Sequence, residues 1–159
     1  MDYRIRDARP EDLPEIVKLC IEHAEFERAE YSPDGKAVKL AEYLFADQPR
    51  LFCLVAETPS GEIFGYTTFM KEFSTWDADH FMHMDCLFLR PEGRSSGVGA
   101  ALVREIAERA AANECKQIQW HTPPFNKRAI KFYLRIGAVS RGKTRFYLNE
   151  GAIAAMTAI

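Results

Sequence analysis

The sequence contains no long hydrophobic segment and no excess of positive charge. No run approaches the ~18 consecutive apolar residues that a membrane-spanning helix requires, and the first residues predict no signal peptide. Lysine and arginine number 21 against 23 aspartate and glutamate residues, which gives a net charge of −2. Because nucleic-acid-binding proteins carry a basic surface, this balance argues against a nucleic-acid partner. We therefore expect a cytoplasmic protein that binds neither a membrane nor a nucleic acid.

The chain also has few cysteines, and they form no C-x-x-C pair. Its four cysteines lie far apart in apolar surroundings, which is typical of reduced core residues rather than of a disulfide framework. With 159 residues, of which 47% are hydrophobic and 28% charged, the composition is that of an ordinary globular protein. A chain of this length buries about 68–70% of its unfolded surface, so we expect one domain that spans residues 1–159.

One stretch is rich in the residue types that bind metals, namely Asp77, Asp79, His80, His83 and Asp85. If this stretch forms a strand, His80 and His83 point to opposite faces, and no cysteine or glutamate completes a compact ligand set. The sequence therefore predicts no metal site.

The first third of the chain predicts a short strand and two helices. Residues 3–6 alternate between apolar and charged, and the apolar residues from Leu13 to Ala24 share one helical face. Ser32 and Pro33 predict the N-cap and the first position of the second helix. The apolar face of that helix is expected to comprise Val38, Ala41, Leu44 and Phe45.

Two strands of a hairpin follow. Residues 51–56 and 63–69 predict the two strands, and Gly65 indicates a bulge or a close backbone approach. Residues 71–80 are polar and predict a loop. On this loop, Trp76 is either the wall of a substrate site or a packed anchor.

The second half predicts a strand–helix–strand unit. Residues 81–89 predict a buried strand, a helix extends to about residue 112, and residues 117–121 predict another strand. Because such units cross over right-handed within one sheet, the two strands should be parallel. A helix at 127–136 that Gly137 ends, a strand at 143–148 and a short helical tail complete the chain. The fold class expected is α/β (α+β), with a mixed, mostly antiparallel sheet.

The segment after the 81–89 strand has the features of a phosphate-binding loop. It reads Arg94-Ser95-Ser96-Gly97-Val98-Gly99-Ala100 and opens a helix. Backbone N–H groups at a helix N-terminus attract a phosphate or pyrophosphate, and glycine allows a ligand to approach the backbone. The P-loop pattern fails because alanine follows Gly99, and a dinucleotide fingerprint would need glycine at Leu102. A tight turn without a ligand is the alternative.

The loop fits the pattern [RQ]-x-x-G-x-[GA], which resembles the acyl-coenzyme A loop of the GNAT N-acetyltransferases. A second motif, Asn126-x-x-Ala129-x-x-Phe132-Tyr133-x-x-x-Gly137-Ala138, is similar to that family too. The resemblance extends over residues 3–148. The strand Met84-Asp85-Cys86-Leu87-Phe88-Leu89 is loosely similar to the corresponding strand of diamine and spermidine acetyltransferases, with Asp85 in the place of their glutamate.

The resemblance implies the GNAT fold, in which two parallel central strands splay apart, and acetyl-coenzyme A (acetyl-CoA) as the cofactor. It also implies a homodimer. The cofactor-binding residues that it implies are Leu87, Phe88, Leu89, Arg94, Ser95, Ser96, Gly97, Val98, Gly99, Ala100, Asn126 and Phe132.

Acetyl transfer to an amine needs a base for the ammonium proton and an acid for the departing thiolate. Strand alternation places Asp85 on the face of Leu87 and Leu89, where the resemblance implies the cofactor, so Asp85 is the candidate base, directly or through water. His83, expected on the same face, or His121 could serve instead, or each could be an ordinary hydrogen-bonded residue. Tyr133 aligns with the family's general acid; the alternative is a core aromatic residue.

The acceptor is expected to be a small cationic amine. Four carboxylates, Glu22, Glu25, Glu27 and Glu30, lie close together beside Phe26 and are either a solvated face or an amine-binding cluster. The candidate substrate-binding residues are Glu25, Phe26, Glu30, Trp76, His83 and His121.

Two other functions remain open. A protein or peptide N-acetyltransferase would use the same cofactor site with a more open acceptor groove. A non-catalytic coenzyme A sensor would need neither Asp85 nor Tyr133.

Overall fold

The computed structural model describes residues 2–158, which separate into two compact units, one up to residue 126 and one from residue 127 onward. The first unit contains the sheet, three α-helices and two short 3₁₀-helices, Pro10–Asp12 and Pro91–Gly93, and the second contains two α-helices and the segment between them. The expectation of a single domain over residues 1–159 stays a prediction. Within residues 2–158, no helix combines the length and the apolar character needed to cross a membrane.

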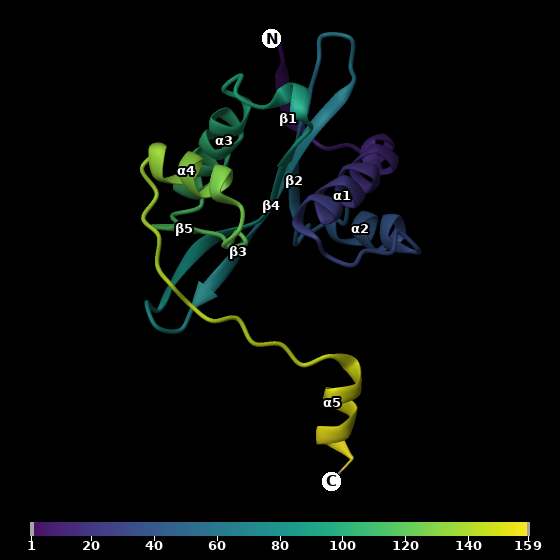
Figure 1. Cartoon of the computed structure of the whole chain (residues 1–159), viewed down its shortest axis with the longest axis vertical. Helices are drawn as coiled ribbons and strands as arrows, with labels where there is room; N and C mark the ends of the chain where they lie inside the picture. The colour runs from purple at the N-terminus through teal and green to yellow at the C-terminus, as the bar shows by residue number, and fades with distance from the viewer. Residues whose placement is uncertain (1, 159) are drawn as a thin grey trace. The chain divides into compact units, whose positions relative to one another are not determined.

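The first unit is built on one five-stranded sheet (Figure 1). Its strands follow the chain order and are β1 (Arg4–Asp7), β2 (Phe52–Glu57), β3 (Ile63–Ser74), β4 (Asp79–Leu89) and β5 (Ile118–Gln119). The neighbours from β1 to β4 pair antiparallel, whereas β4 and β5 pair parallel. This confirms the mixed, mostly antiparallel sheet and the parallel crossover.

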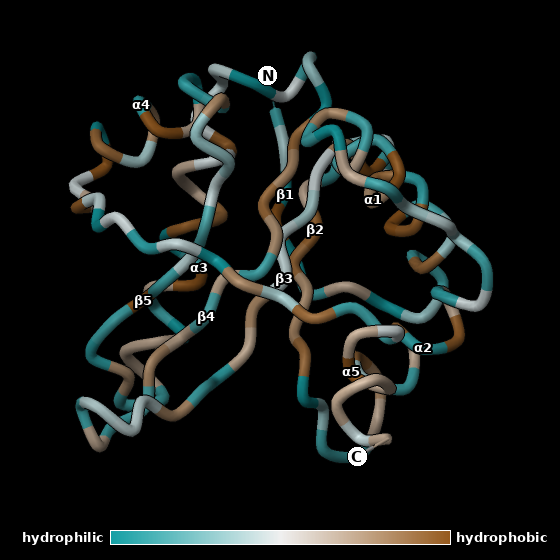
Figure 2. Tube along the Cα trace, turned by 60° about the horizontal axis from the view of Figure 1, so that its bottom comes forward, coloured by the Kyte–Doolittle hydropathy of each residue, from teal (hydrophilic) through white to brown (hydrophobic). Residues whose placement is uncertain are grey.

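Helices cover both faces of this sheet. On one face lie α1 (Leu13–Glu27) and α2 (Lys36–Leu44), and on the other lies α3 (Val98–Ala112) (Figure 1). The core under α1 and α2 includes Ile16, Leu19, Leu44, Val55, Tyr66 and Phe88. In α3, Leu102 and Ile106 are fully buried. Figure 2 shows the hydrophobic residues following the strands between the two helical layers.

The hairpin between β3 and β4 is longer than the sequence predicts. The predicted loop at 71–80 is wrong, because β3 continues to Ser74 and β4 begins at Asp79. The polar residues of this extension pair across the two strands, and antiparallel strands tolerate water on a face. The turn is short because the Ser74 hydroxyl donates to Asp77 (2.8 Å) and accepts from its backbone N–H (3.2 Å).

A β-bulge interrupts β4 at Asp85. Thr68 pairs with Cys86 and Phe69 pairs with Met84, so Asp85 is the extra residue without a partner on β3. A bulge of one residue reverses the facing of the side chains on either side of it. The alternation on which the sequence prediction relied therefore holds only up to this residue.

Gly65 in β3 pairs with Leu89, the last residue of β4. A Cβ atom at this position would lie 2.2 Å from Leu89 Cδ2 and 3.0 Å from the Phe88 carbonyl oxygen. The close backbone approach predicted from the sequence is thus confirmed, and a larger residue would force the strands apart.

The start of α2 differs from the prediction. Ser32 is not its N-cap, because the Ser32 hydroxyl contacts Asp34 and the helix begins after Gly35 at a left-handed φ of 69°. A serine bonded to a residue two positions later forms a turn of its own. Val38, predicted to face the core, is 65% exposed.

In the second unit, α4 (Lys127–Arg135) ends as predicted. Gly137 has a φ of 97°, and the Ala138 N–H donates to the Tyr133 carbonyl (3.0 Å), which is the pattern of a glycine-terminated helix. The predicted strand at 143–148 is wrong, since these residues have no ladder partner among the described residues and Phe146 is 89% exposed. The chain then forms α5 (Glu150–Thr157), which Asn149 caps.

Candidate functional site

The strands β4 and β5 touch only briefly. Their ladder consists of Met82 with Ile118 and His83 with Gln119. Beyond these pairs β4 continues to Leu89, whereas the segment that follows β5 leaves the sheet. The rings of His83 and His121 lie 5.8 Å apart at this point. The sheet is therefore open beside the last residues of β4, where the loop to α3 begins.

The loop to α3 has the conformation that a phosphate-binding loop requires. Gly97, the residue before α3, has a φ of 89°, and a Cβ atom built on it would meet nothing within 4 Å. A side chain is therefore disfavoured by the backbone, while the space next to it is open to a ligand. The Ser96 hydroxyl donates to the Gly93 carbonyl (2.7 Å) and fixes the turn.

The first N–H groups of α3 have no partner within the helix, and its 15 residues give it a dipole with a positive N-terminal end. These features fit the pyrophosphate of coenzyme A, which the N–H groups of Val98, Gly99 and Ala100 would hold.

Arg94 links this loop to α1. Its Nε donates to the Leu89 carbonyl (2.8 Å). Its guanidinium lies 4.9 Å from the ring centroid of Phe26 in α1 and 5.6 Å from that of Phe88. The positive charge is thus held over two aromatic faces, close to the turn at Ser95, whose φ is 67°.

The bulge changes which predicted residues share a face. His83 pairs with Met70, and Leu87 pairs with Thr67, so the side chains of His83 and Leu87 point to opposite faces. The prediction that both lie on one face is wrong for this reason. Phe88 is buried in the core under α1, whereas Leu87 and Leu89 are half-buried on the other face and Asp85 is exposed.

The four carboxylates of the α1 region do not act as one group. Glu22 pairs with Arg90 at 2.6 Å, and Arg90 also binds Glu15 at 2.7 Å. These two carboxylates raise the pKa of Arg90 above its usual value. Glu27 faces His23 instead, and only Glu25 and Glu30, with Phe26 beside them, remain exposed. An amine-binding cluster would therefore rest on these last two carboxylates.

No motif in the sequence indicates His23, which lies on α1 and packs against β3 and β4. Its Nδ1 lies 3.2 Å from the Tyr66 hydroxyl, its Nε2 lies 3.4 Å from a Glu27 oxygen, and its ring stacks on Phe88 at 5.2 Å. Burial lowers the pKa of His23 below its usual value, and the charges of Glu27 and Asp85 oppose that shift. The signal that could have revealed it is a histidine four residues before a glutamate on one helical face.

Thiol and phenol groups lie in the core beneath α1, on this side of the sheet. Burial raises the pKa of the Cys86 thiol to about 12, and burial also raises the pKa of the Tyr66 hydroxyl. The Cys86 Sγ also lies 3.7 Å from Asp85 Oδ2. Burial likewise raises the pKa of the Cys20 thiol. These groups therefore stay protonated and neutral at physiological pH.

The remaining predicted residues lie in several places. Trp76, at the β3–β4 turn, is 97% exposed, and His121 is exposed after β5. Asn126 ends the first unit. Phe132 and Tyr133 are half-buried in α4 of the second unit, with ring centroids 5.1 Å apart. The roles predicted for these residues stay predictions.

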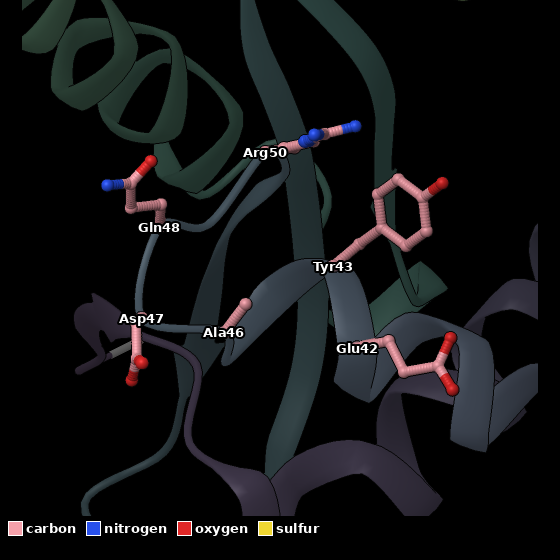
Figure 3. A pocket seen from close by; sticks show the side chains of 6 residues that line it. All are labelled: Glu42, Tyr43, Ala46, Asp47, Gln48 and Arg50. Carbon is pink, nitrogen blue, oxygen red and sulfur yellow. The ribbon is translucent and has the colours of Figure 1, made fainter.

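A separate pocket of about 580 Å³ lies at the end of α2. It is lined by Glu42, Tyr43, Ala46, Asp47, Gln48 and Arg50, none of which is a predicted site residue. Figure 3 shows that the side chains spread apart instead of converging on a common point. Within residues 2–158, no group of three histidine, cysteine or acidic side chains is arranged to hold a metal.

Comparison with known proteins connects this geometry to one family. Residues 16–138 match the Acetyltransferase (GNAT) family. The thialysine N-epsilon-acetyltransferase of Mus musculus is 30% identical over 153 residues, which cover 92% of this chain and 89% of that protein. The spermidine/spermine N(1)-acetyltransferase-like protein 1 of Homo sapiens is 26% identical over 87% of this chain and 21% of that longer protein.

Solved structures show the same fold. An aminoglycoside N-acetyltransferase in complex with CoA superposes with a TM-score of 0.78, at 18% sequence identity, over 94% of this chain and 95% of that one. The predicted fold, with its parallel pair of β4 and β5, is therefore confirmed. With the match over residues 16–138, these findings establish that the chain belongs to the GNAT family and is an acyl-CoA-dependent N-acetyltransferase.

Proposed function

We propose that this protein transfers the acetyl group of acetyl-CoA to a primary amine of a small cationic molecule. The observation that carries the proposal is the open end of β4, where the exposed Asp85 precedes a loop and helix N-terminus suited to a pyrophosphate. The similar proteins named for thialysine and for spermidine and spermine support a small amine as the acceptor.

The chain's own residues would divide the chemistry among them. Acetyl-CoA supplies an activated acetyl thioester. The α3 N-terminus and the turn at Gly97 would hold its pyrophosphate, and the exposed backbone edge of β4 at Leu87 to Leu89 would align its arm. Asp85 would accept the proton of the acceptor ammonium, directly or through water, because an alkyl ammonium with a pKa near ~10 is not nucleophilic at neutral pH. Tyr133 would donate a proton to the departing thiolate.

Glu25, Phe26 and Glu30 would attract the cation, with Trp76, His83 and His121 at the edges of the acceptor region. His83 and His121 stay candidate bases beside Asp85. The homodimer implied by the family resemblance also belongs to this proposal.

The test combines a cofactor-binding experiment with an activity assay. Gly97→Asp places a carboxylate at the pyrophosphate position, and Gly61→Asp is the matched control because Gly61 has a similar φ of 88° and equally open surroundings in a distant turn. Calorimetry should show at least a tenfold loss of acetyl-CoA affinity for Gly97→Asp and no change for Gly61→Asp. Equal affinities would contradict the cofactor site.

The activity assay follows release of the coenzyme A thiol with a panel of diamines, polyamines, lysine-like amino acids and peptides. We expect turnover with at least one of these. Turnover only with peptides would favour the protein acetyltransferase alternative. Binding of acetyl-CoA without any turnover would favour the coenzyme A sensor.

A further inference from the structure

Phe26 is an exposed aromatic residue whose ring meets a charged side chain of the loop between β4 and α3. It lies in the last turn of α1 and is 41% exposed. The Arg94 guanidinium lies 4.9 Å from its ring centroid and 5.6 Å from that of Phe88. The two rings are 6.5 Å apart and tilted by 59°. The cation therefore contacts one aromatic ring from α1 and one from β4, and both attract it electrostatically.

The end of α1 that carries this exposed ring is held in place by its neighbours. His23, three residues before the ring and on the same helical side, stacks on Phe88 at 5.2 Å. Its Nδ1 lies 3.2 Å from the Tyr66 hydroxyl. Arg90, which follows β4, binds Glu22 of the same helix at 2.6 Å. The fold itself therefore sets the position of the ring, before any ligand binds.

The backbone holds Arg94 from another side. Its Nε donates to the carbonyl of Leu89, the last residue of β4 (2.8 Å). Contact with a ring face uses no N–H donor, so the aromatic contacts do not compete with an anion for the donors of the guanidinium. A side chain that is already held also loses less rotamer freedom when a ligand binds. The contacts thus preorganise a positive charge three residues before Gly97, where the proposed function places the pyrophosphate.

We propose that Phe26 is a positioning residue of the cofactor site, whose ring holds the Arg94 guanidinium where it meets the pyrophosphate of acetyl-CoA. This inference rests on the cofactor part of the proposed function. None of the cofactor-binding residues that the sequence predicts lies in α1. The inference therefore adds this helix to the cofactor site and gives a second role to a residue expected to contact the acceptor amine.

A double-mutant cycle separates this role from simple packing of an exposed ring. The cycle combines Phe26→Leu, which keeps an apolar side chain without a ring face, with Arg94→Ala. Calorimetry measures the acetyl-CoA dissociation constant of wild type, the two single variants and the double variant. The matched control is Phe73→Leu, which removes another exposed ring, in β3 near its turn to β4.

We expect Phe26→Leu to weaken acetyl-CoA binding about three- to tenfold. Phe26→Tyr, which keeps a ring face, should retain most of the affinity that Phe26→Leu loses, and Phe73→Leu should bind like wild type. In the Arg94→Ala background, Phe26→Leu should have little further effect, because the side chain that the ring positions is missing. Equal losses in both backgrounds would overturn the proposal, as would an unchanged affinity in Phe26→Leu.

An acetyl donor without phosphates gives an independent readout. S-acetylpantetheine carries the same thioester as acetyl-CoA but lacks the pyrophosphate. With an amine that wild type acetylates, Phe26→Leu should lower kcat/KM for acetyl-CoA and leave kcat/KM for S-acetylpantetheine unchanged. An equal loss with both donors would show a structural role only and would overturn the proposal.

These experiments distinguish failure of this inference from failure of the proposed function. If wild type acetylated no amine while the cycle gave the expected affinities, the proposed function would be wrong and the role of Phe26 would stand. If the cycle were additive in an active enzyme, only the role of Phe26 would be wrong. A wild type that did not bind acetyl-CoA would contradict both.

Discussion

At the scale of single residues, the bulge at Asp85 decides which side chains serve the site. Without it, Cys86 would continue the face of Met84 and Asp85 would continue that of His83. With it, Cys86 pairs with Thr68 and faces Tyr66 and α1, while Met84 pairs with Phe69 on the side of α3. One extra residue therefore brings the Asp85 carboxylate next to a thiol that belongs to the α1 side.

Tyr133→Phe tests the general acid. The change keeps the ring and its contact with Phe132 and removes only the hydroxyl. We expect kcat to fall by roughly 10²–10⁴-fold, as is typical of lost acid–base catalysis, with acetyl-CoA affinity little changed. Steady-state kinetics and calorimetry measure the two quantities, and Tyr147→Phe at an exposed position of the same unit is the control. A Tyr133→Phe variant that turns over like wild type would assign the proton donor elsewhere.

At the scale of elements, the C-terminal half of α1 serves several neighbours at once. Arg90 binds this helix through Glu15 and Glu22, and Arg94 reaches it through Phe26. Arg28, the C-cap of the helix, has a left-handed backbone conformation, and its guanidinium lies 4.7 Å from the ring centroid of Phe125. The helix therefore connects the β4–α3 loop with the segment after β5. We expect changes at the exposed Glu25 in this helix and Glu30 beyond its end to affect binding of the acceptor more than the stability of the fold.

Charge reversal at Glu25 and Glu30 tests the acceptor site. Because both side chains are exposed, we expect Glu25→Lys/Glu30→Lys to fold normally and to raise KM for a cationic amine about tenfold. Acetyl-CoA affinity should not change. The control is Glu11→Lys/Glu108→Lys, which alters the net charge equally at exposed positions away from the end of α1. If the two double variants have the same KM, the carboxylates are a solvated face.

At the scale of the whole molecule, a charge network joins the start of α1 to the edge of the sheet. Arg6 in β1 binds Asp12 at 2.6 Å and Glu57 at 2.7 Å, and Arg4 also binds Glu57. Asp12 and Glu57 are both buried. The Arg6 hydrogen bond lowers the pKa of Asp12 and outweighs the effect of burial. Removing one member would leave a buried charge without its partner.

Asp12→Asn should therefore weaken the fold in a pH-dependent way. A carboxyl whose pKa is lowered in the folded state contributes stability above its unfolded pKa, and this contribution is lost as the pH falls through the folded value. We expect a loss of about 3 kcal/mol in the free energy of unfolding at pH 7 and a smaller difference at pH 3. Urea denaturation at both pH values measures this, with the exposed Asp47→Asn as the control. A constant difference would contradict the ionic origin.

The quaternary state is the other property of the whole molecule. The segment after α4 and α5 expose the large apolar side chains of Val139, Phe146, Tyr147, Ile153 and Met156, and apolar side chains that gather on a protein surface mark an interaction site. Light scattering should give a mass twice the 18.2 kDa of the chain. Phe146→Asp/Tyr147→Asp should shift the mass toward the monomer, and Val38→Asp, at an exposed apolar residue of α2, should not. A monomeric wild type would contradict the homodimer.

Local sequence was sufficient for the elements whose signal is local. The strand before the predicted phosphate-binding loop, the helix that follows this loop and the parallel crossover follow from hydrophobic pattern and chain handedness. Gly137 was predicted for the same reason, because it ends the helix that precedes it, whereas the close approach at Gly65 involves Phe88 and Leu89 of β4. The family resemblance followed from two motifs of this kind.

Tertiary structure decided what depends on partners distant in sequence. The bulge at Asp85 arises from pairing with β3, so strand alternation alone misplaced His83 relative to Leu87. Segment 143–148 has the residues of a strand but no ladder partner among the described residues, because a strand needs backbone groups that only another segment or another chain supplies. His23 acquired its neighbours only when α1 packed on β3 and β4. Burial and strand pairing exist only in the assembled fold, so the contacts and the pKa of residues such as His23 cannot be read from the local sequence.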